Sequence, residues 1–371
     1  MTATKVTFVS SHAQLGGSEV YLETLCKALD RSSVRSVIAL EDGPLVSRLE
    51  SAGFSVDLLS TSGRATAMAR SAFMLGRLVR EQGPDVVHAN GIKAAALMAL
   101  AQPVARTPFV WVKHDFSWDG WLGTFVASRA ARVVGVSEAV LQHLPASVRA
   151  RSSVVPNGTS FQPAPRDLAR LNLDLLLTPG DGPVIGLVGR FHPVKGHLEL
   201  IEAAPRILKE LPAARFVFVG GDDPSFPAHR EVVARAVEDA GLAGAFFFFG
   251  HRSDLAKLIG GFDIGVLPSI VVPRGGREGS PYSLIEMMSA GVPVVAYDHG
   301  GIPEVMGGDA GVLVPPGDRV GLAEAIVRLL EDDAERLRIA QGGKRRVGTR
   351  FSVSKMTREM ERIYGSCRRA P

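Results

Sequence analysis

The chain has 371 residues, of which 46% are hydrophobic and 22% charged, and this length suits two domains of ordinary globular composition. It has no apolar run near the roughly 20 residues of a membrane span, no signal-peptide pattern and only two cysteines, so we expect a cytoplasmic protein without a disulfide framework. The net charge is +4, but no Lys/Arg-rich run with interleaved aromatics occurs, so we expect no nucleic-acid partner.

The first half of the chain alternates short β-branched runs with helical patterns. The strand-like runs span residues 5–10, 33–40, 55–59, 84–88, 109–113 and 131–136. The helical patterns span residues 18–30, 43–52, 64–81 and 92–101. This alternation predicts a doubly wound parallel sheet, whose ligands lie beyond the carboxyl ends of the strands.

A second alternation of the same kind begins at Val184. Its strands are expected at 184–189, 215–220, 245–250, 263–269 and 293–297, and its helices at 196–210, 229–240, 253–260, 283–290 and 320–333. Residues 159–182 are flanked by Pro and Gly and are predicted to connect the two domains. We therefore expect an acceptor domain at 1–165, a donor domain at 166–350, and a closing helix within 351–371 that crosses back to the first domain.

The excess of positive charge lies in the first half. Residues 1–160 hold 16 Lys and Arg against 12 Asp and Glu, whereas residues 161–371 hold 26 of each. A basic half could contact an anionic membrane surface. Peripheral contact at the inner membrane face is therefore one interpretation, and an ordinary solvated basic face is the other.

Two cations of the second half form a candidate anion site. Arg190 and Lys195 follow a predicted strand and a glycine, and Gly196 opens the next helix. A guanidinium and an ammonium beside a helix N-terminus suit a diphosphate, and they would stabilise the charge of a departing nucleoside diphosphate. The alternative is a pair of solvated surface cations.

Two carboxylates follow at a spacing of eight residues. Glu278 lies in a loop and Glu286 lies about two turns into an apolar helix. Carboxylates accept hydrogen bonds from sugar hydroxyls, so a phosphate site and a polyol site together predict a nucleotide-sugar ligand. A solvated helix face is the alternative, but the loop-forming residues after Glu278 and the apolar residues around Glu286 disfavour it.

Other cofactor sites lack a signature in the sequence. We find no G-x-G-x-x-G after a strand, no P-loop motif, and no cluster of His, Cys and carboxylates at metal-ligand spacing. An Asp-x-Asp placed to hold a diphosphate through a metal is also missing. We therefore expect neither a metal nor another cofactor.

The motifs resemble those of retaining glycosyltransferases of family GT4 (glycosyl transferases group 1). The matching stretches are GGSE at 16–19, VVHANG at 86–91, KHD at 113–115, VSE at 136–138, VVPNG at 154–158, GRFHPVKGH at 189–197, GHRSD at 250–254 and EGSPYSLIE at 278–286 with its AGVPVVAYDHGGIPE tail. The resemblance implies the GT-B fold, in which two Rossmann-like doubly wound parallel-sheet domains face a central cleft. It also implies transfer from a UDP-, GDP- or ADP-sugar to a hydroxyl of a glycan, a lipid-linked acceptor or a small molecule.

The resemblance also assigns residues to the site. The implied catalytic residues are His114, Arg190, Lys195 and Glu278. The implied donor-binding residues are Gly16, Gly17, Arg190, Lys195, Arg252, Lys257, Glu278, Gly279, Ser280, Pro281, Tyr282, Ser283 and Glu286. Many relatives have an aromatic residue where this chain has Ser280, so the departure concerns the shape of the sugar pocket.

The acceptor side is assigned from the first half. Asn90 and Lys93 follow the strand predicted at 84–88, and His114 is expected to orient the donor sugar rather than to act as a nucleophile. Trp118 and Trp121 could stack on an acceptor sugar, or they could anchor their loop in the core. Two other functions on the same fold stay open at this point: a nucleotide-sugar epimerase or phosphorylase, and a sensor that binds nucleotide sugars without turnover.

Overall fold

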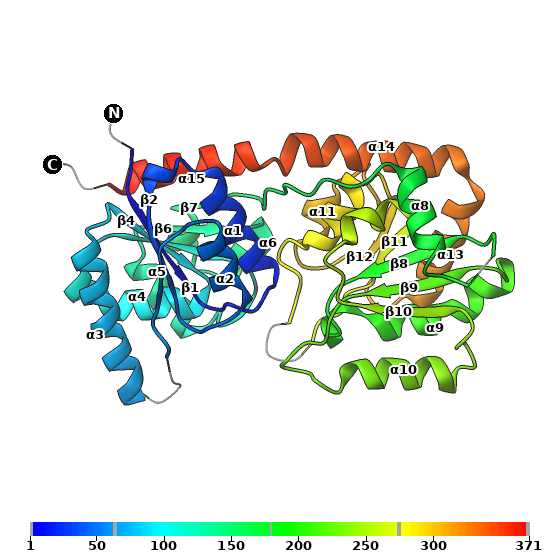
Figure 1. Ribbon diagram of the computed structural model, residues 1–371, viewed down its shortest axis with the longest axis horizontal. Coiled ribbons are helices and arrows are strands. Elements are labelled where there is room, and N and C mark those ends of the chain that lie inside the picture. The colour runs from blue at the N-terminus through cyan, green and yellow to red at the C-terminus, as the bar shows by residue number, and fades with distance from the viewer. Residues whose placement is uncertain (1–2, 62–64, 179, 273–275, 369–371) are drawn as a thin grey trace. The chain divides into compact units, whose positions relative to one another are not determined.

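The computed structural model describes residues 3–61, 65–178, 180–272 and 276–368, and the chain forms two compact units (Figure 1). Unit 1 consists of Met1–Ser160 together with Phe351–Pro371, and unit 2 consists of Phe161–Arg350. The structural division therefore falls five residues before the predicted boundary at 165, and the C-terminal segment belongs to the first unit.

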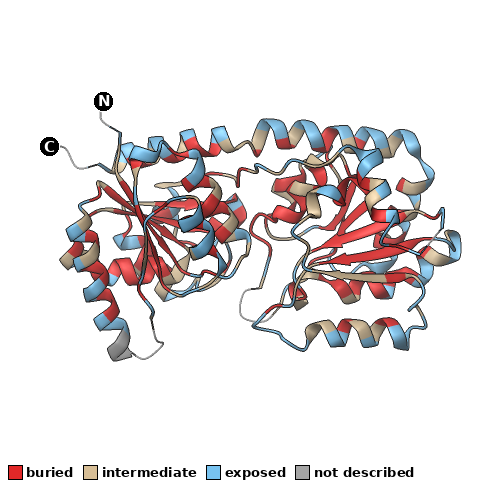
Figure 2. Cartoon of the chain, viewed as in Figure 1, coloured by how far each residue is buried: buried red, intermediate tan, exposed pale blue. Residues whose placement is uncertain are grey.

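Unit 1 is built on a seven-stranded sheet in the order β3-β2-β1-β4-β5-β6-β7, and every pairing is parallel. The strands are β1 (Val6–Ser10), β2 (Val34–Ala39), β3 (Val56–Leu58), β4 (Val86–Asn90), β5 (Phe109–Lys113), β6 (Arg132–Gly135) and β7 (Ser152–Val154). All five residues of β1, β4 and β5 are buried, as expected for parallel strands covered on both faces (Figure 2).

The helices of unit 1 connect these strands, and the last one closes the unit. They are α1 (Gly17–Ala28), α2 (Pro44–Ser51), α3 (Ala65–Gln82), α4 (Ile92–Ala105), α5 (Trp121–Arg129), α6 (Glu138–Leu141), α7 (Ala146–Arg149) and α15 (Val353–Cys367), with a 3-10 turn η1 (Arg31–Ser33). Helix α15 packs against α1, and Met360 and Tyr364 of α15 are buried. Val353–Cys367 is thus part of this core although it follows unit 2 in the chain.

Unit 2 has a six-stranded parallel sheet in the order β10-β9-β8-β11-β12-β13. Its strands are β8 (Val184–Val188), β9 (Arg215–Val219), β10 (Phe246–Gly250), β11 (Ile264–Leu267), β12 (Val294–Tyr297) and β13 (Val312–Val314). Its helices are α8 (Arg166–Asp174), α9 (His197–Glu210), α10 (His229–Asp239), α11 (Tyr282–Ser289), α12 (Ile302–Met306), α13 (Arg319–Glu331) and α14 (Asp333–Arg350), with the 3-10 turns η2 (Pro193–Lys195), η3 (Leu255–Lys257) and η4 (Ile259–Gly261).

The prediction of two parallel-sheet α/β domains is confirmed, and two details of it were wrong. The segment predicted as a connection contains α8, whose Arg166 and Arg170 each form a 2.7 Å ion pair with Asp263, so this helix is packed into unit 2. The helix predicted at 253–260 is instead the pair of 3-10 turns η3 and η4. None of the helices in the described part of the chain is long and apolar enough to cross a bilayer.

Candidate active site

The residues predicted around the diphosphate contact one another directly in unit 2. The ammonium of Lys195 donates to Oε1 of Glu278 at 2.7 Å, and the hydroxyl of Ser269 donates to the same oxygen at 3.2 Å. The two partners of the ion pair are 83 positions apart in the chain, and their side chains are 18% and 10% exposed. A mostly buried ammonium is thereby held beside a carboxylate at the carboxyl edge of the sheet.

Glycines make this arrangement sterically possible. Gly196 caps α9 with φ +71°, and a Cβ there would lie 1.8 Å from the carbonyl oxygen of Pro268. The same loop carries Lys195, whose side-chain stem lies against Gly189. Any side chain at Gly196 would push this loop away from the Glu278 segment, so the glycine fixes where the ammonium is placed.

Arg190 lies between β8 and η2 and is held by a carboxylate that the sequence reasoning missed. Its guanidinium lies 2.9 Å from Oδ2 of Asp223, a buried residue that follows β9, and the Arg190 side chain is 46% exposed. Strand β9 is the immediate neighbour of β8, so both residues emerge at the same edge. The signal that could have found Asp223 is its position just after the strand at 215–219.

Glu286 sits inside α11, close enough to Lys195 for the two charges to interact. Burial raises the pKa of its carboxyl to about 7, and the ammonium of Lys195 opposes that rise. Residues 279–281 precede the helix, and Tyr282 and Ser283 form its first turn. The hydroxyl of Ser283 is buried and makes no hydrogen bond within the described part of the chain, which leaves a polar group near the helix N-terminus for a ligand.

The loop of Glu278 is fixed by a second turn. The backbone N–H of Gly301 donates to the carbonyl of Glu278 at 2.8 Å. Gly300 has φ +59°, and a Cβ there would lie 2.4 Å from the same carbonyl oxygen. The Gly-Gly turn at 300–301 therefore sets the position of Glu278 and belongs to the supporting structure of the site.

Arg252 and Lys257 lie farther from this centre. Arg252 follows β10 and forms two hydrogen bonds to the carboxylate of Asp254, at 2.8 and 2.7 Å. Strand β10 is the edge strand, two positions from β8, which corresponds to about 9–10 Å across the sheet. Lys257 lies in η3, and its carbonyl accepts a hydrogen bond from Asn172. The structure thus does not place these two residues in the Lys195–Glu278 cluster.

In unit 1, His114 and Asn90 form a hydrogen-bonded pair at the ends of β5 and β4. The amide nitrogen of Asn90 donates to the carbonyl of Ser18 at 3.0 Å, which orients its oxygen toward Nε2 of His114 at 2.7 Å. Burial lowers the pKa of His114 to about 4, so the imidazole is neutral at pH 7. This network assigns the proton to Nε2 and leaves Nδ1 as a hydrogen-bond acceptor, the form that suits a sugar hydroxyl.

His88 stands behind this pair and is tied to the C-terminal helix. Its Nδ1 lies 2.6 Å from the hydroxyl of Tyr364, a hydrogen bond across 276 positions of sequence. The ring of Tyr21 packs against both His88 and His114, with centroids 5.9 and 4.9 Å apart. His88 therefore braces the core of unit 1 behind the His114–Asn90 pair.

A pocket of about 660 Å³ opens beside the His114–Asn90 pair, and both residues line it. Lys93 and Trp118, two residues for which an acceptor-side role is predicted, also line this pocket. Trp121 does not line it, but begins α5 with 79% of its surface exposed. Gly16 is the N-cap of α1 and Gly17 is its first residue, directly before Ser18; no contact among the described residues assigns either glycine to a donor.

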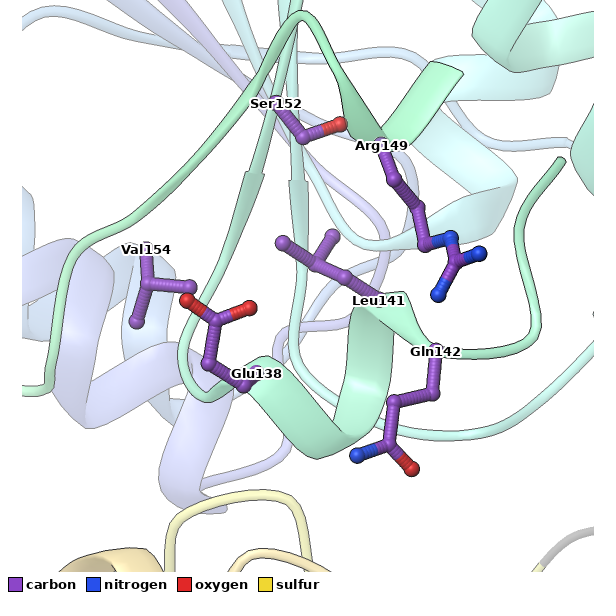
Figure 3. A pocket seen from close by; sticks show the side chains of 6 residues that line it. All are labelled: Glu138, Leu141, Gln142, Arg149, Ser152 and Val154. Carbon is purple, nitrogen blue, oxygen red and sulfur yellow. The ribbon is translucent and has the colours of Figure 1, made fainter. Parts of the chain in front are cut away.

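A smaller pocket of about 310 Å³ lies beside the edge strand β7 and the short helices α6 and α7 (Figure 3). It is lined by Glu138, Leu141, Gln142, Arg149, Ser152 and Val154. Glu138 follows Ser137, a buried residue in the stretch that resembles the family motif. None of the predicted catalytic or donor-binding residues lines this pocket.

Both units match family models, each over its main body. Residues 15–162 match the model described as Glycosyltransferase Family 4, and residues 182–332 match the model described as Glycosyl transferases group 1. The chain belongs to glycosyltransferase family 4. The two matched segments coincide with the parts of this glycosyltransferase that carry the His114–Asn90 pair and the Lys195–Glu278 pair.

The relatives of this glycosyltransferase have several donors and acceptors. It is 24% identical to the UDP-Gal:alpha-D-GlcNAc-diphosphoundecaprenol alpha-1,3-galactosyltransferase of Escherichia coli, over 96% of this chain and 98% of that one. It is 29% identical to the phosphatidyl-myo-inositol mannosyltransferase of Mycolicibacterium smegmatis, over 76% and 70%. It is 30% identical to the 2-deoxystreptamine glucosyltransferase of Streptomyces kanamyceticus, over 61% and 58%.

Solved structures share its fold. HepE of Anabaena, crystallised with UDP-glucose, aligns with a TM-score of 0.86 and 24% identity over 98% of this chain and 100% of that one. Sucrose-phosphate synthase of Thermosynechococcus elongatus aligns with a TM-score of 0.79 and 20% identity, over 98% of each chain. The fold of this glycosyltransferase is therefore GT-B, as expected.

Within residues 3–61, 65–178, 180–272 and 276–368, no group of three or more His, Cys, Asp or Glu side chains is arranged to hold a metal ion.

Proposed function

We propose that this glycosyltransferase moves a hexose-type sugar, with retention and without a metal ion, from a nucleoside-diphosphate sugar to a hydroxyl of a glycan, glycolipid or small-molecule acceptor. The observation that carries the proposal is the Lys195–Glu278 contact of 2.7 Å, with Ser269, Glu286 and the α11 N-terminus around it. A cation for phosphate and carboxylates for sugar hydroxyls are the two recognition elements of a nucleotide sugar.

The proposed chemistry is a same-face substitution. The bond from the anomeric carbon to the phosphate oxygen breaks, and a bond from that carbon to the acceptor oxygen forms on the same face. The acceptor proton passes to the leaving phosphate oxygen, so no protein base is required. Arg190 and Lys195 stabilise the charge that develops on the diphosphate, and the neutral His114 accepts a hydrogen bond from a donor hydroxyl.

The donor is the first component to test. Two relatives are named for the donors UDP-Gal and GDP-mannose, and HepE was crystallised with UDP-glucose. A thermal-shift screen of UDP-, GDP- and ADP-sugars should show one that raises the melting temperature of the protein well above the others, because only a ligand of the native state stabilises it. If no nucleotide sugar does so, the proposed donor class is wrong.

The role of the leaving-group cations is tested by Arg190→Ala. This variant should lose most turnover, on the order of 10²–10³-fold for one lost charge at the leaving group, and should stay folded with a lower melting temperature because buried Asp223 loses its cation. Arg206→Ala, at an exposed position of α9, is the matched control and should retain turnover. Full activity in Arg190→Ala would refute the assignment.

The stereochemistry and the reaction class have separate tests. The anomeric configuration of the first product, read by proton NMR before mutarotation, should match that of the donor; an inverted product would exclude the same-face mechanism. Donor incubated with the protein alone should remain unepimerised, since epimerised donor would favour an epimerase on this fold.

We also propose that the protein is cytoplasmic and that unit 1 contacts the anionic inner face of the membrane. The support is α3, where the apolar residues Phe73 and Met74 and the cations Arg77 and Arg80 are all exposed. An exposed apolar pair flanked by arginines suits a headgroup surface. The protein should sediment with vesicles containing phosphatidylglycerol and not with pure phosphatidylcholine vesicles, and equal recovery with both would exclude charge-driven contact.

A further inference from the structure

The 660 Å³ pocket of unit 1 has a polar end and an apolar wall. The polar end includes Asn90 and Lys93, the residues expected on the acceptor side, and His114, which the proposed function assigns to a donor hydroxyl. Six apolar residues form the apolar wall, alongside the polar lining residues Ser11, His12, Ser18, Thr61, Asp115 and Ser117; the six are Met68, Ile92, Ala96, Leu97, Trp118 and Leu122. A purely polar glycan would leave this wall without a complementary partner, because apolar lining gains affinity only by removing apolar surface from water.

Trp118 is held at this wall in an unfavourable backbone conformation. Its φ is +56°, in the left-handed region that bulky residues rarely adopt, and 63% of its surface is exposed. Its carbonyl accepts a hydrogen bond from the N–H of Gly123 at 3.0 Å, and a Cβ on Gly123 would lie 2.5 Å from that carbonyl oxygen. The start of α5 thus keeps a large aromatic side chain strained and uncovered beside the pocket, as a ligand surface would require.

Apolar side chains recur beyond the pocket along the same two helices, among charged ones. A second hollow of about 570 Å³ is lined by Phe73 and Val104 together with Arg77, Arg80 and Glu81. Met68 and Phe73 belong to α3, and Ala96 and Val104 belong to α4, so both hollows follow the contact between these helices (Figure 1). Leu100 of α4 lies between them in sequence and is also exposed. An extended apolar chain fits this arrangement better than a compact hydrophobic group.

We propose that the acceptor carries a linear apolar chain and that this pocket holds the part of the chain nearest the hydroxyl-bearing head. The head lies at Asn90 and Lys93, beside the donor sugar at His114, and the chain lies on the wall formed by α3, α4 and Trp118. The inference rests on the proposed function, since it names the class of acceptor for that transfer. The acceptor is therefore an amphipathic, lipid-like molecule.

Binding of n-alkyl β-D-glucosides to the full-length protein tests this directly. With the ethyl, butyl, hexyl and octyl compounds, each below its critical micelle concentration, affinity should rise by up to about fourfold per methylene until the pocket is filled. Tryptophan fluorescence reports binding, and Trp118→Phe should remove most of the change. Equal, weak binding of all four compounds would overturn the inference, and so would phenyl β-D-glucoside binding more tightly than the octyl compound.

Variants of the pocket give a second test. Ala96→Phe fills the wall and should weaken octyl glucoside binding at least tenfold while leaving the ethyl compound unchanged. Ala96 is buried, so this variant could fail to fold. Met68→Glu is an independent change at a partly exposed position of the wall, and it should also weaken octyl glucoside binding. Ala150→Phe, at an exposed position of unit 1 outside the pocket, is the matched control. Wild-type octyl glucoside binding in both folded pocket variants would overturn the inference.

The two proposals fail in different ways. Transfer from a nucleotide sugar to polar acceptors only, with no rate gain for alkylated ones, would overturn the amphipathic acceptor and leave the glycosyl transfer intact. Chain-length-dependent binding in a protein that neither binds nor turns over any nucleotide sugar would support the pocket and refute the proposed donor.

Discussion

Replacing Glu286 by Gln should stabilise the protein at pH 8 and leave its stability unchanged at pH 4. Burial raises the pKa of this carboxyl from an ordinary value of 4.5 to about 7, while Lys195 partly counteracts burial. Between these two pH values the folded state binds more protons than the unfolded state, so the free energy of unfolding falls as pH rises. Below pH 4.5 the acid is neutral in both states, and glutamine resembles it.

The size of the effect follows from the same shift. A difference of 4.5 to about 7 corresponds to about 3 kcal/mol at about 1.4 kcal/mol per pH unit, and the partial exposure of Glu286 lowers our expectation to about 2–3 kcal/mol. For a unit of this size, Glu286→Gln should raise the melting temperature at pH 8 by about 4–12 °C. The ionised carboxylate of wild-type Glu286 thus lowers the stability of the folded protein at pH 8. We expect this of a group that is retained because it binds a ligand.

Differential scanning calorimetry of both proteins between pH 4 and pH 8 measures this difference. Glu324→Gln, which changes an exposed carboxylate on α13, is the control and should shift the melting temperature little at either pH. In the wild type, nucleotide affinity should also rise as pH passes 7, and this rise should be absent in Glu286→Gln. A Glu286→Gln gain that is equal at pH 4 and pH 8, or no gain at all, would refute the reasoning.

Three further changes test other parts of the structure. Tyr364→Phe removes the 2.6 Å hydrogen bond to buried His88 and should lower the stability of unit 1 by about 1–3 kcal/mol. Calorimetry should show a lower melting temperature for the first transition, with nucleotide binding unchanged. An unshifted transition would contradict the hydrogen bond. Gly196→Ala places a Cβ 1.8 Å from the Pro268 carbonyl at φ +71° and should abolish nucleotide binding, whereas Gly308→Ala, in open space, should not. Excess EDTA should leave turnover unchanged, and activity restored only by a divalent ion would disprove metal independence.

The local pattern of apolar and polar residues was sufficient to predict most of the strands and helices. The runs of β-branched residues predicted the buried parallel strands, because strands covered on both faces must be apolar along their length. Helix α14 was not predicted from the sequence, because Gly342, Gly343 and its many charged residues obscure the helical spacing of its apolar residues. A Cβ on Gly342 would lie 2.3 Å from the carbonyl of Asp309, so the glycine allows α14 to pack closely against that segment, a contact that is evident only in the folded unit.

The candidate site divides in the same way. Sequence alone determined its residue types: Arg190 and Lys195 after a glycine turn, Glu278 and Glu286 around a helix start, and His114 at a strand end. Only the tertiary structure decided which of them meet, because the Lys195–Glu278 contact joins residues 83 positions apart and depends on two adjacent strands of one sheet.

Partners that carry no motif of their own were also decided by the fold. Tyr364 beside His88 and the apolar wall of the unit 1 pocket are recognisable only once distant segments are packed together, and the same packing pairs Asp223 with Arg190. The pKa of Glu286 is likewise a property of its burial, which a linear sequence does not contain. The sequence determines the chemistry of each residue, whereas the contacts, burial and charge balance of these residues arise from the packing of the whole unit.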